Sequence, residues 1–290
     1  MANLTCVVIT PVRDEEQYLP LTIASMAAQT QPPKAWVIVN DGSKDRTGEL
    51  IDAAAAKHPW IKAVHRKDRG SRQAGSGVIA AFYDGYALVA NDDWDVVVKF
   101  DGDLSFGPDF FARCLNEFVL EPKLGIGGGT CCKPQPGEMI TESPGEPPFH
   151  VRGPNKFYRR ECFKQIGGLI TAPGWDTVDH LKANLLGWAT RTFADIRLIH
   201  HRPTGGAYGS WSNSMKNGVA NYVTGYAPTF MAAKCLLRFL RGHFQDAVGL
   251  WCGFLKGYWK GIAQVPDPEL IRYVRRQQWL ALTGRKSLWR

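Results

Sequence analysis

Two aspartates, Asp101 and Asp103, flank a single glycine at the end of the apolar run VVVKF (96–100). Carboxylates this close repel each other unless a cation lies between them or one of them is protonated. Mg²⁺ and Mn²⁺ prefer oxygen ligands, and proteins commonly hold them with one or two carboxylates together with substrate phosphates. We identify no basic residue nearby in the sequence that would neutralise the two carboxylates. Their spacing therefore predicts a site for a divalent metal ion. A lone Asp-x-Asp triplet also suits a turn or a helix start, and the surrounding elements must decide.

A second acidic loop, NDGSKDRT, follows the apolar run WVIVN (36–40), with Asp41 at its start. A tight turn on Gly42 followed by a capped helix explains these residues without any ligand. Alternatively, Asp41 at the tip of a strand accepts hydrogen bonds from a nucleotide base. The motif by itself does not separate the two interpretations.

The elements that must position these loops are short apolar runs that alternate with helix-length segments. Runs that are apolar on both faces predict a parallel sheet covered by helices on both sides, which is a Rossmann-like α/β fold. Ligands of such sheets bind outside the carboxyl ends of the strands, so we expect one site at that edge. The predicted strands are 6–10, 36–40, 61–65 and 95–100, and the loops after them contain TPVRDEE, NDGSKDRT, RKDRGSRQAG and DGD.

The middle of the chain is predicted to begin with a long surface loop over 133–158, which is rich in proline and glycine. Loops of this length are usually functional or disordered. We expect a helix in YRRECFKQIGG, another from Asp176 to Leu186, and a strand in TRTFADIRLIHH. From about Trp211 the pattern changes to helices, the last of which follows Asp267 as a candidate cap. We therefore predict a catalytic domain over 1–210 and a helical segment over 211–290.

The charge of the chain is concentrated in its last part. The formal net charge is +8, and from Phe230 onward eleven Lys or Arg stand against three acids, so the first 229 residues are formally neutral. A basic, aromatic-rich helical segment suits a helix that lies at an anionic lipid surface. A helical cap on the catalytic domain, or a dimer interface, would also explain it.

Length, composition and cysteine usage limit the classes of protein to which the chain could belong. A chain of 290 residues with 44% hydrophobic content can bury a full core. The seven cysteines match neither a disulfide framework nor a zinc site, so we expect reduced thiols in the core. We see no signal peptide and no apolar run near the ~18 residues needed to cross a bilayer. We expect a cytoplasmic protein, peripheral at the cytoplasmic face of the membrane.

Taken together, the motifs resemble those of family 2 glycosyltransferases in order and spacing, over residues 4–205. The resemblance implies the GT-A fold, here with an amphipathic C-terminal helical extension. It also implies an inverting, hexosyltransferase-type transfer from a nucleotide sugar, with UDP favoured as the common donor and with Mn²⁺ or Mg²⁺ required. The acceptor would be a hydroxyl of a glycan or lipid-linked molecule in cell-envelope or exopolysaccharide synthesis. The matching segments are TPVRDEEQYLPLTIASMAAQTQPPKAWVIVNDGSKDRT, KFDGDLSFGPDFF, RRECFKQIGGL and GWDTVDHLKANLLGW.

The resemblance implies roles for the residues that match the donor-binding motifs of the family. Asp101 and Asp103 match the aspartates that hold the metal and the ribose and diphosphate of the donor, so the counterion would arrive with the substrate. In some similar enzymes a histidine after the last strand completes the metal shell. Adjacent strand residues face opposite ways, so at most one of His200 and His201 faces the site, and we assign His200. The nucleotide pocket is implied for Pro11, Arg13, Glu15, Asp41, Arg69 and Gly70, with Asp41 against the base.

The segment GWDTVDHLK matches the place where the family usually carries Glu-Asp and its catalytic base. Here the pair reads Trp175-Asp176, so the preceding acid is absent. We assign the base to Asp176, with Asp179 one helical turn on as the fallback. An acid favoured by the dipole at a helix N-terminus is the alternative. Contacts with the acceptor or the diphosphate are predicted for Arg152, Arg159, Arg160, Trp175 and Asp179.

Other functions stay open on the sequence alone. A polyprenyl phosphate acceptor is already an oxyanion and needs no base, so Asp176 would lose its role. A nucleotidyltransferase usually carries a glycine-rich loop after its first strand, and TPVRDEE has no glycine. A non-catalytic protein that binds nucleic acid or membrane would explain the basic segment but not the acidic motifs. We therefore expect no nucleic-acid partner, and the oligomeric state is not predicted.

Overall fold

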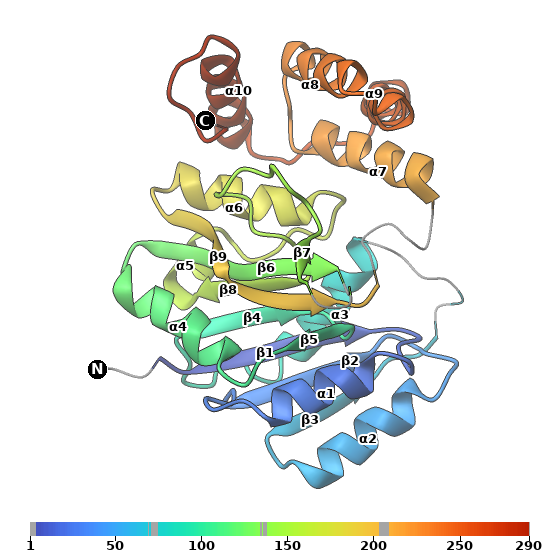
Figure 1. The fold of residues 1–290 in the computed structure, drawn as a ribbon, viewed down its shortest axis with the longest axis vertical. Coiled ribbons are helices and arrows are strands. Elements are labelled where there is room, and N and C mark those ends of the chain that lie inside the picture. The colour runs from blue at the N-terminus through green and yellow to red at the C-terminus, as the bar shows by residue number, and fades with distance from the viewer. Residues whose placement is uncertain are drawn as a thin grey trace.

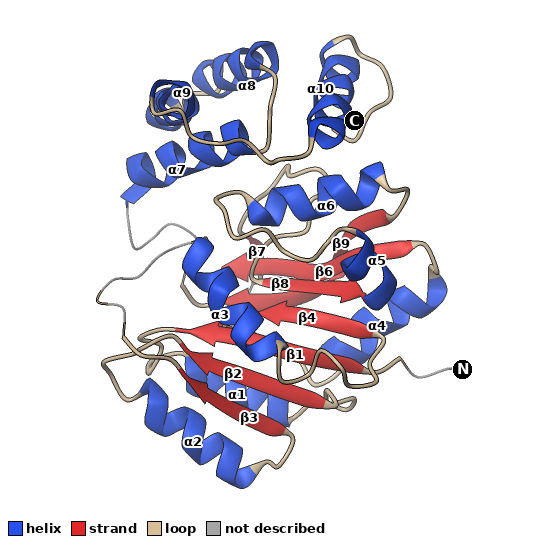
Figure 2. Cartoon of the chain, turned by 180° about the vertical axis from the view of Figure 1, so that it is seen from behind, coloured by secondary structure: helices blue, strands red, loops and turns tan. Residues whose placement is uncertain are grey.

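The structure, a computed structural model, describes residues 4–68, 70, 75–133, 135, 138–202 and 209–289. Within them, nine strands form one sheet in the order β3-β2-β1-β4-β8-β6-β9-β5, with β7 paired to β6. Helices cover both faces of the sheet, and the last four helices lie beyond α6 (Figures 1 and 2). The elements are β1 (Cys6–Val12), α1 (Leu19–Ala27), β2 (Ala35–Asn40), α2 (Thr47–Lys57), β3 (Ile61–His65), α3 (Ser76–Tyr86), β4 (Val96–Phe100), β5 (Leu104–Phe106), α4 (Phe110–Leu120), β6 (Leu124–Lys133), β7 (Ile140–Thr141), β8 (Asn155–Arg159), α5 (Arg160–Gln165), α6 (Trp175–Leu185), β9 (Ala189–His200), α7 (Gly209–Val223), α8 (Pro228–Leu240), α9 (Phe244–Trp259) and α10 (Pro268–Leu282).

The four strands predicted from apolar runs are confirmed, and they pair in parallel as expected. β1 pairs with β2 and with β4, and β2 pairs with β3. Every residue of β2 and β4 is buried, because alternate side chains pack into two different cores. One core packs against α1, α2 and α4, and the other against α3, α5 and α6. The polar loops after these strands are thereby held at one edge of the sheet.

The second half of the sheet is mixed, and of its strands only β9 was predicted from the sequence, so that β5, β6, β7 and β8 were missed. β8 lies inside the predicted long loop and runs antiparallel to β4, with Phe100 opposite Asn155. β6 was hidden by its glycines, which are poor strand formers. They are needed because neighbouring groups approach closely: a methyl group at Gly129 would lie 2.7 Å from the carbonyl oxygen of Ile196, and one at Gly127 would overlap the ring of Phe193.

The C-terminal helices share a third core with α6. Val178 and Leu181 of α6 pack with residues of α7 to α10, such as Tyr222, Phe254 and Val274. The predicted cap of the last helix is confirmed, because the Asp267 carboxylate accepts a hydrogen bond of 2.9 Å from the backbone N–H of Leu270. Of the helices in the described ranges, none is both long and apolar enough to cross a bilayer.

The contact between α7 and α9 is made largely backbone to backbone. Three glycines one helical turn apart on α9 face α7, namely Gly249, Gly253 and Gly257. A methyl group at Gly253 would overlap the carbonyl of Met215, and one at Gly257 would overlap the ring of Tyr222. α7 therefore packs closely on α9, backbone against backbone at Gly253 and with the Tyr222 ring of α7 against Gly257.

The cysteines are free thiols, as predicted. Six are buried, and Cys252 on α9 is exposed. Burial raises the pKa of Cys6 and of Cys131 to about 12, which keeps both thiols protonated at neutral pH.

Candidate active site

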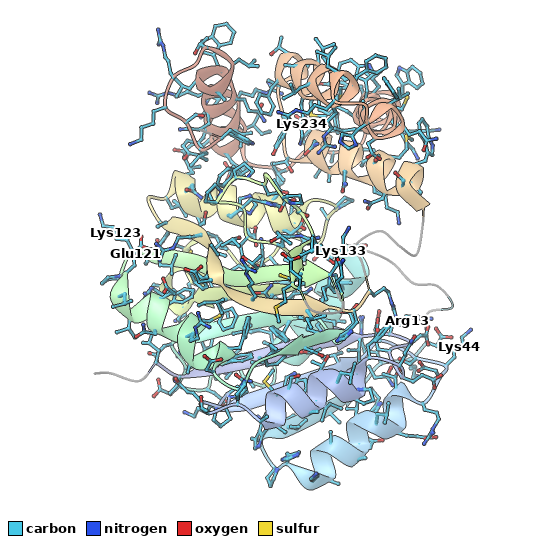
Figure 3. The ribbon with its side chains drawn as sticks, in the orientation of Figure 1. Arg13, Lys44, Glu121, Lys123, Lys133 and Lys234 are labelled. Atoms are coloured by element: carbon cyan, nitrogen blue, oxygen red, sulfur yellow. The ribbon has the colours of Figure 1, made fainter. Side chains whose placement is uncertain are left out.

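Several of the predicted polar residues lie at the carboxyl edge of the parallel strands. Asp101 and Asp103 follow β4, and Asp41 follows β2. Figure 3 shows Arg13, in the loop after β1, on this side of the molecule, whereas Glu121 and Lys123 lie on the opposite side. The arrangement agrees with the rule that ligands of such sheets bind at the carboxyl ends of the strands.

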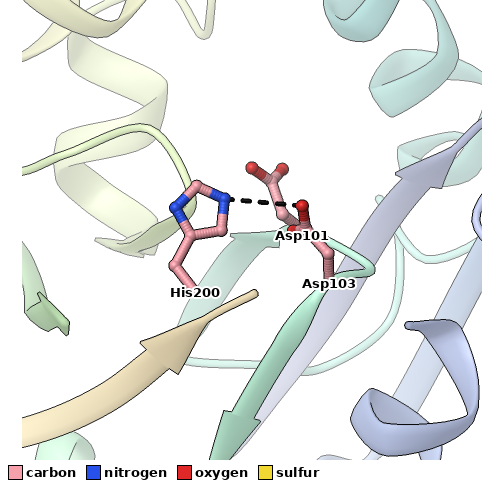
Figure 4. Close-up of side chains that lie close together, drawn as sticks. All are labelled: Asp101, Asp103 and His200. Atoms are coloured by element: carbon pink, nitrogen blue, oxygen red, sulfur yellow. Dashed lines mark ion pairs between the residues drawn. The ribbon is translucent and has the colours of Figure 1, made fainter. Parts of the chain in front are cut away.

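A candidate metal centre forms where β5 meets β9. β5 begins immediately after Asp103 and pairs antiparallel with β9, with Leu104 opposite His200. This pairing brings His200 beside both aspartates, although it is about a hundred residues away in the chain (Figure 4). One ligand atom from each of Asp101, Asp103 and His200 lies within 4.8 Å of the others. Two carboxylates and one imidazole are donors that suit Mn²⁺ and can also hold Mg²⁺.

The two adjacent histidines at the end of β9 face different surroundings. His200 is 4% exposed, and its Nε2 lies 3.5 Å from Asp103 Oδ2. His201 instead makes a 2.7 Å hydrogen bond with Ser105 and stacks on Tyr18. The geometry thus brings His200 to the aspartates, as the assignment requires, and directs His201 away from them.

The charged groups of the cluster shift one another's pKa values. Burial alone would lower the pKa of His200, but its contacts with Asp103 and Glu142 outweigh this and raise the pKa to about 9. Burial also raises the pKa of Asp101, because the attraction of Lys99 does not fully offset the loss of water and the repulsion by Asp103. With its pKa at about 9, His200 is protonated at neutral pH when no metal is bound, so a metal that used it as a ligand would have to displace that proton.

Lys99 corrects our expectation that the aspartates have no basic partner in the chain. It lies two residues before Asp101, is 2% exposed, and forms an ion pair with the Asp101 carboxylate. Its Nζ also donates a 3.0 Å hydrogen bond to the carbonyl of Gly153. A single lysine in an otherwise apolar buried strand was the signal we missed, because a buried ammonium must be paired.

Glu142 is the second residue that the sequence analysis missed. It follows β7, and its buried carboxylate lies 3.0 Å from His200 Nδ1, on the side of the imidazole opposite Asp103. Arg152, which we predicted to contact the acceptor or the diphosphate, forms an ion pair with Glu142 instead. That expectation is corrected: Arg152 supports a carboxylate behind the metal centre.

The predicted nucleotide residues form a network of charged contacts. Arg13 is 7% exposed and donates to the carbonyl of Asp41 at 2.7 Å and to the Asp68 carboxylate at 2.6 Å. Arg66 donates to the Asp41 carboxylate at 2.6 Å. Hydrogen bonds from Arg13 lower the pKa of Asp68 to about 2. Asp41 and Arg13 thus contact each other directly. Two residues that we did not single out, Arg66 and Asp68, hold the side chains of Asp41 and Arg13, respectively.

The remaining predicted nucleotide residues have different surroundings. Glu15 is 5% exposed and receives two hydrogen bonds from Arg202, of 2.8 and 2.9 Å. Pro11 is part of β1, next to Val39 of β2. Gly70 is exposed and has a φ of 77°, a conformation that glycine adopts without strain. Arg69 lies outside the described residues.

The predicted catalytic base, Asp176, lies in the first turn of α6. A methyl group placed on Gly153 would be 3.4 Å from Asp176 Oδ2 and 3.3 Å from the ring of Trp175. The carbonyl of Gly153 binds Lys99, and Lys99 pairs with Asp101. Asp176 therefore lies near Gly153, the residue whose carbonyl accepts a hydrogen bond from Lys99.

Trp175 is buried rather than turned toward an acceptor, which corrects that prediction. Its ring lies 5.4 Å from Lys99 Nζ and 5.5 Å from Lys156 Nζ. The two lysines are neighbours on β4 and β8, where they stand opposite each other in the sheet register. Trp175 therefore covers two buried ammonium groups, a cation–π arrangement that helps α6 pack on the sheet.

The Asp179 carboxylate forms an ion pair with Lys156. This corrects the fallback assignment of Asp179 as the base. Its carboxylate accepts hydrogen bonds of 2.8 and 2.7 Å from Lys156 Nζ and one of 2.6 Å from Tyr158. The side chain is 1% exposed. Burial alone would raise the pKa of Asp179, but Lys156 and His180 lower it overall. A sealed, paired carboxylate has no access to a substrate proton.

Arg159 and Arg160 lie at the wrong end of the sheet for the contacts we predicted. Arg159 stands opposite Val96 at the start of β4, whereas Asp101 follows the end of that strand. Its guanidinium donates to the carbonyls of Leu124, Phe118 and Glu121, at 2.9, 2.6 and 3.2 Å. Arg160 lies over the ring of Trp94 at 4.5 Å. Both arginines therefore stabilise the fold at the edge opposite the metal centre.

The pair formed by Lys156 and Asp179 gives a stability prediction. We expect Lys156→Met to lower the free energy of unfolding by about 3–5 kcal/mol, because it leaves a buried carboxylate without its partner. Since the folded state lowers the pKa of Asp179, the pair contributes fully above about pH 4 and its contribution is lost as the pH falls further. Urea unfolding near neutral pH measures the loss.

The matched control is Lys62→Met, also on a strand. Lys62 is 42% exposed, and its Nζ lies 3.9 Å from Asp92, so we expect less than about 1 kcal/mol. Equal losses for the two variants would contradict the prediction.

Comparison with known proteins agrees with the class that the fold and site define, a GT-A glycosyltransferase. The chain belongs to glycosyl transferase family 2, whose model matches residues 7–163. It is similar to a mannosyltransferase, PcManGT, from Pyrobaculum calidifontis, solved in complex with GDP-Man and Mn²⁺. That similarity has a TM-score of 0.57 at 17% identity and covers 99% of this chain and 77% of the other, which supports the fold alone.

Two curated relatives match part of the chain. One is an undecaprenyl-phosphate mannosyltransferase of Micrococcus luteus, 31% identical over 119 residues, which is 41% of this chain. The other is a polyprenol monophosphomannose synthase of Mycolicibacterium smegmatis, 33% identical over 128 residues, or 42% of this chain. The chain spans about half the length of these relatives, because each match covers 46% of the relative.

Proposed function

We propose that this glycosyltransferase is inverting and metal-dependent, and that it transfers a sugar from a nucleotide-sugar donor to a hydroxyl of a lipid-linked or glycan acceptor. UDP is the favoured nucleotide, and cell-envelope or exopolysaccharide synthesis is the favoured setting. The observation that carries the proposal is the convergence of Asp101, Asp103 and His200 at the carboxyl edge of the sheet. A nucleotidyltransferase or a nucleic-acid-binding protein is not supported by the family match.

Asp101, Asp103 and His200 would hold Mn²⁺ or Mg²⁺, and these donors fit such an ion. When bound, the metal would neutralise charge on the leaving nucleoside diphosphate. Asp101 would also contact the ribose or the diphosphate. Arg13, Glu15, Asp41 and Pro11 would line the nucleotide pocket, with Asp41 against the base.

Asp176 would act as the general base. The acceptor oxygen forms a bond with the anomeric carbon while the bond from that carbon to the diphosphate oxygen breaks, so the configuration inverts. The hydroxyl proton passes to the Asp176 carboxylate, which must be ionised and within hydrogen-bond reach. Its place beside Gly153, which Lys99 ties to Asp101, supports this role. No covalent intermediate with the enzyme is required.

A polyprenyl phosphate acceptor is the second candidate, and the names of the two curated relatives favour it. A phosphate oxyanion attacks the anomeric carbon without giving up a proton, so Asp176 would not act as a base. Only the hydroxyl acceptor therefore requires Asp176 to act as a base.

Calorimetric titration with UDP, GDP and TDP, each with and without Mn²⁺, tests the proposed donor site. We expect metal-dependent binding of one nucleotide, because the diphosphate completes the coordination that the three side chains begin. If no nucleotide binds under either condition, the proposed donor site is refuted.

Glu142 is expected to orient His200 for metal binding. A histidine ligand usually donates its second ring N–H to a carboxylate, which fixes the tautomer and raises the basicity of the ligating nitrogen. We expect Glu142→Gln to weaken Mn²⁺ binding about 10–100-fold, measured by the electron paramagnetic resonance of free Mn²⁺. Glu146→Gln, in the same segment, should leave the affinity unchanged. Equal affinities for the Glu142 variant and the wild type would exclude the role.

A further inference from the structure

The helices α8 and α9 carry an exposed apolar surface that the proposed chemistry does not use. On α8, the residues 236, 237, 239 and 240 fall within about 160° of one another around the helix axis. On α9, Phe244 and Val248 follow at a spacing of four residues, and the rings of Phe239 and Phe244 lie 4.7 Å apart. We call this surface the apolar ridge, and it consists of Leu236, Leu237, Phe239, Leu240, Phe244 and Val248, all exposed.

The ridge is too apolar and too contiguous for an ordinary surface. Leu240 is 72% exposed and Leu236 is 59% exposed, and the other members are at least 45% exposed. Contiguous apolar side chains on a soluble protein usually mark an interaction site. At the other end of α9, Trp259 is 85% exposed between Tyr258 and Lys260. Tryptophan and tyrosine beside lysine are typical of residues at a lipid–water interface.

The charge around the ridge identifies the partner. Between Pro228 and Gly261 the chain has five basic residues and a single acid, Asp246. That acid accepts hydrogen bonds from Ser210 and Ser214, at 2.7 and 2.8 Å, so its charge is partly satisfied by the protein. The exposed residues among the five basic ones are Arg241, Lys256 and Lys260, whereas Arg238 is half-buried and Lys234 lies over the ring of the buried Tyr226. Two copies of the chain that met on this surface would oppose like charges, whereas an anionic lipid surface complements them.

The position of the ridge also fits a membrane partner. In both Figures 1 and 2, α9 lies on the side of the molecule toward which β1, β2 and β4 point. The metal centre lies at the carboxyl ends of these strands. Because α8 and α9 lie beyond α7 at one end of the molecule, a bilayer that touched both helices would lie at that end.

We propose that the apolar ridge on α8 and α9 inserts its side chains into the acyl region of an anionic phospholipid bilayer, while the exposed residues Arg241, Lys256 and Lys260 bind the headgroups. The helices lie in the plane of the interface, as amphipathic helices of peripheral proteins do. The inference deepens the proposed function, because it gives a lipid-linked acceptor a place from which to reach the site. Its physical basis is the ridge itself and not the donor chemistry.

The test compares two double variants in vesicle co-sedimentation. Leu237→Ser with Leu240→Ser removes two of the three leucines of the ridge. The matched control is Leu88→Ser with Leu120→Ser, on the sheet domain. The exposures correspond: Leu237 is 50% and Leu88 is 48% exposed, and Leu240 is 72% and Leu120 is 69% exposed. Leu240 and Leu120 each end a helix, α8 and α4.

We expect the wild type to bind vesicles that contain about one third phosphatidylglycerol at least tenfold more tightly than vesicles of phosphatidylcholine alone. The ridge variant should lose at least about tenfold in affinity for the anionic vesicles, and the control variant should not. Binding should also weaken as salt is added. Circular dichroism and thermal unfolding check that both variants fold.

Several outcomes would overturn the inference. They are an absence of binding to either vesicle, equal loss in the ridge and control variants, and a wild-type dimer that only the ridge variant dissociates, since a second copy would then cover the surface. The same samples are titrated with nucleotide and Mn²⁺ in the absence of vesicles. Protein that binds vesicles but no nucleotide would refute the proposed donor site and leave the membrane inference standing, and the reverse result would do the opposite.

Discussion

Replacing Asp103 by asparagine is expected to abolish metal-dependent nucleotide binding and to lower turnover on the order of a thousandfold. Asparagine keeps the size of the side chain but removes the charge that would hold the metal. Asp103 is 7% exposed, and its carboxylate lies 3.5 Å from His200 Nε2. Titration calorimetry with and without Mn²⁺ measures the binding, and release of the nucleoside diphosphate measures turnover.

The control for this variant is Asp195→Asn. Asp195 is exposed on β9, the strand that ends in His200, and it is not in the cluster of possible ligands. It should bind nucleotide and metal as the wild type does. If Asp103→Asn retained metal-dependent binding, the metal would lie elsewhere and our candidate centre would be wrong.

Replacing Asp176 by asparagine is the variant that identifies the acceptor. With a hydroxyl acceptor, we expect turnover to fall about 10²–10⁴-fold, because the amide cannot take the proton. With a polyprenyl phosphate acceptor, turnover should change by less than about threefold, since no proton must be removed. Nucleotide affinity should be unchanged in either case, because Asp176 lies beside Gly153 and not among the metal donors.

The measurement is a transfer assay with two acceptors of matched lipid length, one with a free sugar hydroxyl and one with a terminal phosphate. A large loss confined to the hydroxyl acceptor supports the base. Full activity of Asp176→Asn on a hydroxyl acceptor that the wild type uses well would remove Asp176 from the mechanism.

The parts of the fold that could be predicted are those with a local pattern. β1, β2 and β4 are apolar on both faces, and the polar loops after them follow directly in the sequence. These features are sufficient to predict that Asp41, Asp101 and Asp103 share one edge of the sheet. The cap of α10 by Asp267 was equally local, because it depends on residues three positions apart.

The parts that could not be predicted depend on pairings between distant segments. Glu142 reaches His200 only because β7 folds back on β6, which pairs with β9. Nothing in the spacing of acids within residues 138–146 indicates which one is buried. Arg159 and Arg160 match a family motif, yet the antiparallel register of β8 carries them to the far end of the sheet. Lys99 was readable, because it interrupts an apolar strand, and it was overlooked.

The glycine row on α9 has a consequence for the choice of acceptor. With backbone packed against backbone at Gly253 and the Tyr222 ring fitted against Gly257, the two helices have little freedom to slide and would move as one body. α7 begins only nine positions after His200 in the chain, and α9 carries part of the apolar ridge. If the ridge rests on a bilayer, the reacting centre is held at a set height above it. The protein would then select acceptors by the length of the polar spacer between lipid and reacting group, independently of what that group is.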